Sequence, residues 1–177
     1  MPAVIEGVFI ISGIPGAGKT TVSRLLAERL GNGVHIESDL LQEWIRSGGL
    51  WPQEEPREEA ERQLKLRTSN VCLLADSYRD AGFTPVIDDV VIGARLQDFI
   101  SALRTRPIRL VLLAPSIDVV EQRDRDRDYK QVFEIWGHLD AAMRSERPRR
   151  GLWLDTSAMT VEETVAAIVT RRDEARL

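Results

Sequence analysis

The stretch Gly13-Ile14-Pro15-Gly16-Ala17-Gly18-Lys19-Thr20 matches the phosphate-binding loop pattern G-x-x-x-x-G-K-[ST] at every fixed position. The apolar run 8–11 enters it as a buried strand would, and the amphipathic stretch 21–30 leaves it as a helix. Glycines let backbone N–H groups turn inward around phosphate oxygens, and the helix N-terminus adds partial positive charge at the same point. The sequence therefore predicts nucleotide contacts from Gly13, Pro15, Gly16, Ala17, Gly18, Lys19, Thr20 and Thr21.

Two side chains of this loop bring specific chemistry. Lys19 carries a mobile positive charge that reaches the β- and γ-phosphates of a bound nucleotide. The hydroxyl of Thr20 is a ligand for Mg²⁺ in such loops. We therefore expect ATP and Mg²⁺ as cofactors.

The composition restricts the class of protein. The chain has 177 residues, of which 43% are hydrophobic, enough for one domain with its own core. Its net charge of −4 argues against nucleic acid or an anionic membrane as partner. The single cysteine, Cys72, excludes an intramolecular disulfide, and no apolar run approaches the length of a membrane span. We expect a cytoplasmic monomer or homodimer.

Segments with strand character alternate with amphipathic helical segments along the whole chain. This alternation predicts a three-layer α/β fold, in which a five-stranded parallel sheet lies between two layers of helices. We expect one domain over residues 1–177, with a short helical lid at about 123–133 and an acceptor-covering region at about 39–80. The expected strands are 8–12, 34–36, 84–88, 108–114 and 151–154, and the expected helices include 39–47, 57–81 and 132–144.

Acidic residues follow the expected strands, and the carboxyl ends of parallel strands are where such sheets bind ligands. A kinase for a hydroxyl acceptor needs a carboxylate that orients the hydroxyl and accepts its proton. Asp39 is the candidate for this role, and its alternative is a helix N-cap. Asp88 is the candidate for Mg²⁺, directly or through water, with a strand-end turn as its alternative. Asp89 is expected to face either the acceptor or solvent.

Basic and aromatic residues supply further candidates. Arg123 and Arg127 are four residues apart, share a helical face and could meet the transferring phosphate from a lid, or form a solvated charged helix. Arg46 and Trp51 belong to the region that would cover an acceptor, where packing or exposure is the alternative. The two histidines, His35 and His138, do not have metal-ligand spacing.

These motifs together resemble the small-molecule kinases of the phosphate-loop superfamily, with the adenylate, shikimate and gluconate kinases as broad relatives. The resemblance is particularly to the chloramphenicol phosphotransferase-like group and to gluconate-kinase-like proteins. It implies the fold of the nucleoside-monophosphate kinases with strand order 2-3-1-4-5, Asp39 as the catalytic base, and Thr156 or Ser157 near the adenine. It also implies that the lid arginines contact the nucleotide. It rests on 13–20, Ser38-Asp39, 86–90 followed by Gly93, Arg123 with Arg127, and Asp155-Thr156-Ser157.

The sequence thus favours a kinase that moves the γ-phosphate of ATP to a hydroxyl of a small molecule, such as an antibiotic like chloramphenicol or a sugar acid. Three alternatives stay open. The first is a nucleotide-dependent ATPase or switch without an acceptor. The others are a kinase of a nucleic-acid 5′-hydroxyl and a toxin-like kinase of nucleotide sugars.

Overall fold

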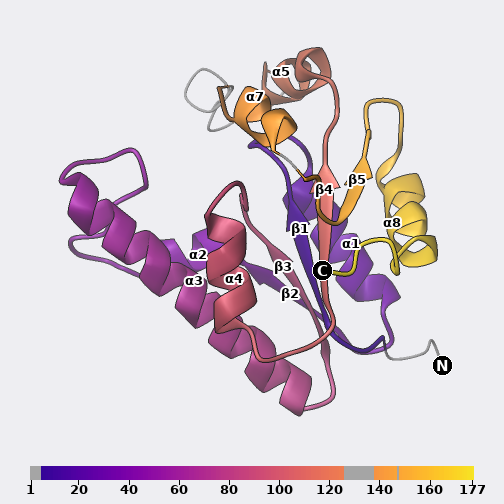
Figure 1. Ribbon diagram of the computed structural model, residues 1–177, viewed down its shortest axis with the longest axis horizontal. Helices are drawn as coiled ribbons and strands as arrows, with labels where there is room; N and C mark the ends of the chain where they lie inside the picture. Colours follow the sequence, from indigo (N-terminus) through magenta and orange to yellow (C-terminus); the bar gives the residue numbers. More distant parts are fainter. Residues whose placement is uncertain (1–4, 126–137, 147) are drawn as a thin grey trace.

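A five-stranded parallel sheet forms the centre of the computed structural model, which describes residues 5–125, 138–146 and 148–177 (Figure 1). The strand order is β2-β3-β1-β4-β5, so the expected three-layer fold and strand order are confirmed. The strands are β1 (Val8–Ser12), β2 (Gly33–Glu37), β3 (Thr84–Asp88), β4 (Ile108–Leu113) and β5 (Leu152–Leu154).

The sheet is held by apolar strands that are buried on both faces. Every residue of β1, β3 and β4 is buried, as expected for strands covered by helices on both sides. β1 lies between the other two, with Ile10 aligned to Ile87 of β3 and to Leu110 of β4. This parallel register brings the carboxyl ends of the strands to one edge of the sheet.

Two pairs of helices cover the two faces. On one face, α1 (Lys19–Arg29) packs against β2, β3 and α8 (Val161–Thr170). On the other, α3 (Arg57–Asp80) packs against β3 and α4 (Arg95–Ala102) (Figure 1). None of the helices within the described residues is both long and apolar enough to cross a membrane.

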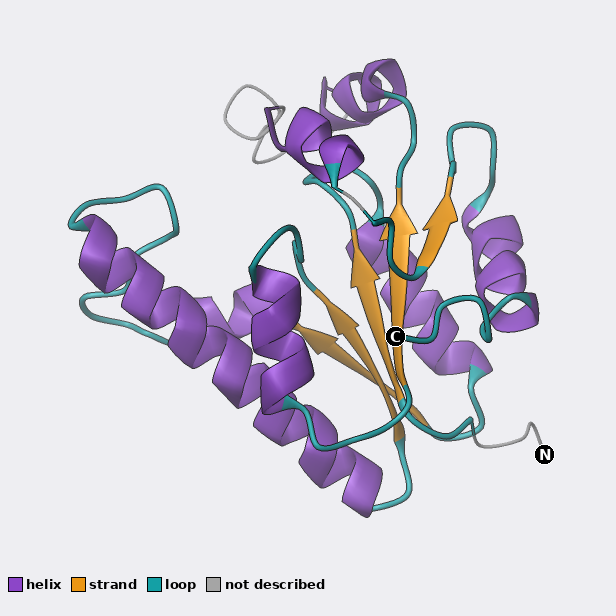
Figure 2. Cartoon of the chain, in the orientation of Figure 1, coloured by secondary structure: helices purple, strands orange, loops and turns teal. Residues whose placement is uncertain are grey.

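Three short helices lie toward the carboxyl edge. Of these, α2 (Ser38–Glu43) follows β2 and packs against α3, so the expected helix 39–47 ends earlier than its sequence indicates. In Figures 1 and 2 the arrowheads of β1 and β4 point toward α5 (Ile117–Arg125) and α7 (His138–Ser145). The first part of the expected helix 132–144, up to residue 137, lies outside the described residues.

The start of α8 is fixed by a pair of reciprocal hydrogen bonds. Thr160 Oγ1 accepts from the backbone N–H of Glu163 (3.1 Å), and Glu163 Oε2 accepts from the backbone N–H of Thr160 (2.8 Å). This capping box satisfies N–H groups that the first turn of a helix leaves without partners. It anchors the connection between β5 and the helix that packs on α1.

Replacing Thr160 by alanine removes the cap, and we expect a loss of about 1 kcal/mol in the free energy of unfolding. Urea titration followed by circular dichroism measures this. Thr170→Ala, at the exposed last residue of the same helix, is the matched control and should change stability by less than about 0.5 kcal/mol. Equal losses in the two variants would contradict a role for the cap.

Candidate nucleotide and acceptor site

The loop between β1 and α1 adopts backbone angles that favour glycine. Gly16 has φ of 92° and Gly18 has φ of 93°, both in the left-handed region that other residues rarely occupy. A Cβ atom on Gly16 would also lie 2.8 Å from Cγ1 of Val120 in α5. Both glycines are therefore needed for the loop to curl under α5 and to lead into α1.

The two reactive side chains of the loop lie at the start of α1. The Lys19 ammonium donates to the backbone carbonyl of Ile14 (3.2 Å), so it folds over the loop to which it belongs. Thr20 is exposed in the first turn of the helix. Loop amides, an ammonium and a hydroxyl thus converge at a helix N-terminus, which is the chemistry that binds phosphate groups.

A hollow of about 270 Å³ opens beside this loop, on the side of β5. The guanidinium Nη2 of Arg123 donates to the backbone carbonyl of Thr156 (3.2 Å) and so links α5 to the segment after β5. The structure thereby brings together two residues that the sequence places at the nucleotide. The lining combines loop glycines with apolar and hydroxyl side chains: Gly16, Ala17, Gly18, Thr21, Val22, Arg123, Thr156, Met159, Val161 and Thr164.

Thr156 has an unusual feature within this hollow. Its side chain is buried, and its Oγ1 has no hydrogen-bond partner among the residues that the structure describes. A buried hydroxyl without a partner is destabilising, and such groups in native proteins call for an explanation. Thr156 lines the hollow, which fits its expected place near the nucleotide base. Because its Oγ1 is itself closed to solvent, a ligand would supply the partner once the side chain turns toward the hollow.

Asp39 lies on the other side of the loop, at the end of β2. It is in the first turn of α2, and the N-cap position belongs to Glu37, so the alternative role of Asp39 as an N-cap is wrong. Its carboxylate accepts from Nη1 of Arg67 (3.2 Å) and keeps 55% of its side chain exposed. Arg67 therefore holds the carboxylate while it stays accessible from solvent.

Asp88 has a partner that the sequence analysis missed. Nε2 of His35 lies 2.8 Å from Oδ2 of Asp88, and Glu37 is aligned with Asp88 across β2 and β3. Burial, and then the charge of Asp88, raise the pKa of Glu37. His35 and Glu37 alternate along β2, so they share one face of the strand. This pattern points to Asp88 only once β2 is known to pair with β3. Binding of Mg²⁺ by Asp88 stays a prediction.

Asp89 points into the protein. Its side chain is only 2% exposed, so the alternative in which it faces solvent is wrong. Nη2 of Arg95 (2.9 Å) and Nη2 of Arg67 (3.2 Å) donate to its two oxygens. Burial acts to raise the pKa of Asp89, but the charges of Arg95 and then Arg67 outweigh it and lower that pKa. The carboxylate thus stays ionised, and its expected contact with an acceptor stays a prediction.

The segment between α2 and α3 is fixed by two glutamines that the sequence analysis did not single out. Gln63 accepts from the backbone N–H of Leu50 (2.8 Å), and Gln42 donates to the carbonyl of Leu50 (2.8 Å). Arg46 is exposed and Trp51 half-buried on this segment, and their contact with an acceptor stays a prediction.

The lid is only partly described. Its first residues, up to Arg125, belong to α5, whereas Arg127 and the rest of the predicted lid lie outside the described residues. Within the described ranges, no three His, Cys, Asp or Glu side chains gather in a way that could hold a metal ion by themselves.

Comparison with known families identifies the class of protein. Residues 10–136 match the model of the AAA_18 family, described as an AAA domain, and the chain belongs to this family. A UPF0200 protein of Aeropyrum pernix is 36% identical over 80 residues. That match covers 44% of this chain and 43% of the relative, so it spans less than half of either protein.

Solved structures that resemble the chain along nearly its whole length include two described as kinases. A sugar kinase from Janibacter sp. HTCC2649 has a TM-score of 0.69 at 16% identity, covering 97% of this chain and 96% of that one. The tunicamycin resistance protein of Deinococcus radiodurans has a TM-score of 0.68 at 20% identity, with 95% and 96% covered. A gluconokinase from Sinorhizobium meliloti 1021 has a TM-score of 0.64 at 21% identity, with 98% and 95% covered. At these identities the likeness establishes a shared fold.

Replacing Thr156 by valine removes the buried hydroxyl and keeps the shape of the side chain. We expect the ligand-free protein to gain about 1 kcal/mol in unfolding free energy, and the affinity for ATP to fall about fivefold. Thermal melting and calorimetric titration with ATP measure the two effects. Thr164→Val is the control: its hydroxyl donates to the carbonyl of Thr160 (2.8 Å), so its loss should destabilise the protein. Unchanged ATP affinity in Thr156→Val would show that the nucleotide does not use this hydroxyl.

Proposed function

We propose that the chain is an ATP- and Mg²⁺-dependent kinase that transfers the γ-phosphate of ATP to a hydroxyl of a small molecule. The order of groups along the carboxyl edge of the sheet carries this proposal. The hollow with Thr156 lies at β5, the phosphate-binding loop at β1, and the exposed carboxylate of Asp39 at β2. β1 and β2 are two strand spacings apart, about 10 Å, so a nucleotide bound from β5 to β1 would present its last phosphate toward Asp39.

Each group along this edge has a role in the proposed reaction. The loop amides and Lys19 hold the phosphates, and Arg123 approaches them from α5. Asp39 orients the acceptor hydroxyl and takes its proton. The acceptor oxygen forms a bond to the γ-phosphorus, the bond from that phosphorus to the β–γ bridging oxygen breaks, and ADP leaves with the electron pair.

The residues near the phosphates also fit a magnesium ion. Thr20 offers a hydroxyl and Asp88 a carboxylate oxygen, and Mg²⁺ is held by few protein oxygens when it is also held by phosphates. When bound, the ion would offset negative charge that develops on the phosphates. Asp88 already shares one oxygen with His35, so its second oxygen would act directly or through water.

The acceptor belongs to the class of small hydroxylated molecules. Proteins of the same fold are described as a sugar kinase, a gluconokinase and a tunicamycin resistance protein, which supports sugars, sugar acids and antibiotics as candidates. The finer likeness to the chloramphenicol phosphotransferase-like group stays a prediction.

Lys19→Ala removes the mobile charge at the phosphates, and we expect turnover to fall by about 10²–10³-fold. The assay follows transfer of the γ-phosphate from ATP–Mg²⁺ to D-glucose, D-gluconate, shikimate and chloramphenicol. Lys65→Ala, at an exposed lysine of α3, is the control and should retain full turnover. Full turnover in Lys19→Ala would refute the proposed role of the loop.

Asp39→Asn keeps the shape of the side chain but removes the proton acceptor. We expect kcat to fall by about 10²–10⁴-fold, with ATP affinity changed by less than about twofold. Asp98→Asn, at an exposed aspartate of α4, should change neither quantity. Slow ATP hydrolysis that persists in Asp39→Asn, together with no phosphorylated product in the wild type, would favour the ATPase or switch alternative.

A further inference from the structure

A buried ionic cluster lies behind Asp39, between α3, α4 and the end of β3. Its innermost member is Asp89, which accepts hydrogen bonds from Arg67, from Arg95 and from the backbone N–H of Val90 (2.7 Å). The exposed fraction of the side chain falls from 55% at Asp39 to 5% at Arg67 and 2% at Asp89. The cluster is thus open to solvent at Asp39 and closed at Asp89.

Arg67 connects the two ends of this cluster. Its Nη1 donates to Oδ1 of Asp39 and its Nη2 donates to Oδ1 of Asp89, both at 3.2 Å. One planar guanidinium therefore bridges two carboxylates, and its rigid fork fixes the position of one relative to the other. Because Asp89 cannot move without breaking its other bonds, the contact transmits its fixed position to Asp39.

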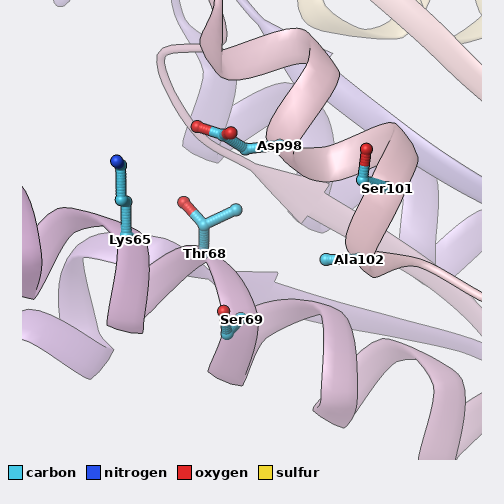
Figure 3. Close-up of a pocket in the computed structure, with 6 residues that line it drawn as sticks. All are labelled: Lys65, Thr68, Ser69, Asp98, Ser101 and Ala102. Carbon is cyan, nitrogen blue, oxygen red and sulfur yellow. The ribbon is translucent and has the colours of Figure 1, made fainter.

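Arg95, the first residue of α4, holds Asp89 from the other side. Nη2 of Arg95 donates to Asp89 Oδ2 (2.9 Å) and to Oγ1 of Thr68 (3.3 Å), next to Arg67 on α3. Thr68 also lines a shallow hollow of about 300 Å³ between α3 and α4, which Figure 3 shows with Lys65 and Ser69 from α3 and Asp98 from α4. Lys65, Ser69 and Asp98 are exposed in this hollow, whereas the side chain of Arg67 is buried.

We propose that Arg67 is a positioning residue, which holds the Asp39 carboxylate in one orientation through the buried Asp89 and does not bind the acceptor itself. This inference rests on the proposed function, because it needs Asp39 to meet the acceptor hydroxyl. Arg67 restrains an exposed carboxylate that lies on a six-residue helix, and so narrows the rotamers that this carboxylate adopts. The carboxylate is thereby held in place before the acceptor arrives, which is what proton transfer requires.

The charges explain why Arg67 is a support and not a receptor for an anionic acceptor. Arg67 and Arg95 carry two positive charges, and Asp39 and Asp89 carry two negative charges within the same contacts. Both terminal nitrogens of Arg67 already donate to carboxylates. An acceptor anion that approached Arg67 would meet the negative charge of these two carboxylates and a guanidinium that is buried, and both disfavour its binding there.

The test is a double-substitution cycle of Arg67→Lys with Asp39→Asn. Turnover of ATP–Mg²⁺ is measured with water, D-glucose or D-gluconate as acceptor, the last two being a neutral and an anionic polyol of similar size. Lysine keeps the charge but lacks the bidentate fork, so we expect kcat to fall about tenfold, with acceptor KM changed by less than about threefold. In the Asp39→Asn background the same change should lower kcat by less than about twofold, because its effect passes through Asp39.

Companion variants keep this test decisive. Arg67→Met should lower kcat by about 10²-fold, as misplaced catalytic groups do. If the Arg67→Met variant fails to fold because Asp89 loses a partner, the test is decided by the Arg67→Lys variant. Arg62→Lys, at an exposed arginine of the same helix, is the matched control and should leave kcat and KM unchanged. Thermal melting and ATP affinity report whether each variant retains its site.

Four results would overturn the inference. Additive losses in the double variant would show that Arg67 acts independently of Asp39. A large rise in KM confined to D-gluconate, with kcat retained, would show that Arg67 binds an anionic acceptor. Full turnover in Asp39→Asn alone would instead overturn the proposed role of Asp39 as base, and the inference with it. Loss of turnover in Asp39→Asn but not in Arg67→Lys would overturn the positioning role only.

Discussion

The parallel pairing of β1 with β3 on one side and β4 on the other is the constraint on which the rest of this structure depends. These strands are buried over their whole length, so their backbone groups must pair with neighbouring strands and not with water. Parallel pairing makes all five strands end at the same edge. Groups that are far apart in the sequence, from Gly13 to Thr156, therefore come together in one row.

In the proposed kinase, the groups that would bind the nucleotide base and the acceptor lie on opposite sides of the phosphate-binding loop. On the β5 side, a hollow built from the loop, α5 and the start of α8 suits a nucleotide base. On the β2 side, α2 and α3 present the exposed Asp39. The first side is built around the phosphate-binding loop, together with residues from α5 and from the segment after β5, whereas the second depends on how a long helix crosses the sheet. One scaffold can then keep its nucleotide chemistry while the acceptor region varies, which is how a single fold serves many substrates.

The buried ion pairs behind Asp39 illustrate a different use of charge. Moving Arg67 and Asp89 out of water costs free energy, and their attraction only partly offsets that cost. A cluster of this kind is therefore weak evidence for stability and better evidence that the charged side chains must be held in fixed positions. The lowered pKa of Asp89, where the charges of Arg95 and Arg67 outweigh burial, keeps its carboxylate ionised and the geometry intact near neutral pH.

The sequence by itself determined the phosphate-binding loop, the α/β class and the acidic residues that end the strands, because each is encoded within a few neighbouring residues. The resemblance to known kinases added the strand order. Only the tertiary structure decided which of these acidic residues is exposed and which is buried. It separated Asp88, beside His35, from its neighbour Asp89, held by two arginines, and it revealed Arg67, an ordinary-looking arginine in a charged helix. Burial and ion pairing depend on which helix packs over which strand, and that information is spread over segments too distant for any local pattern to contain it.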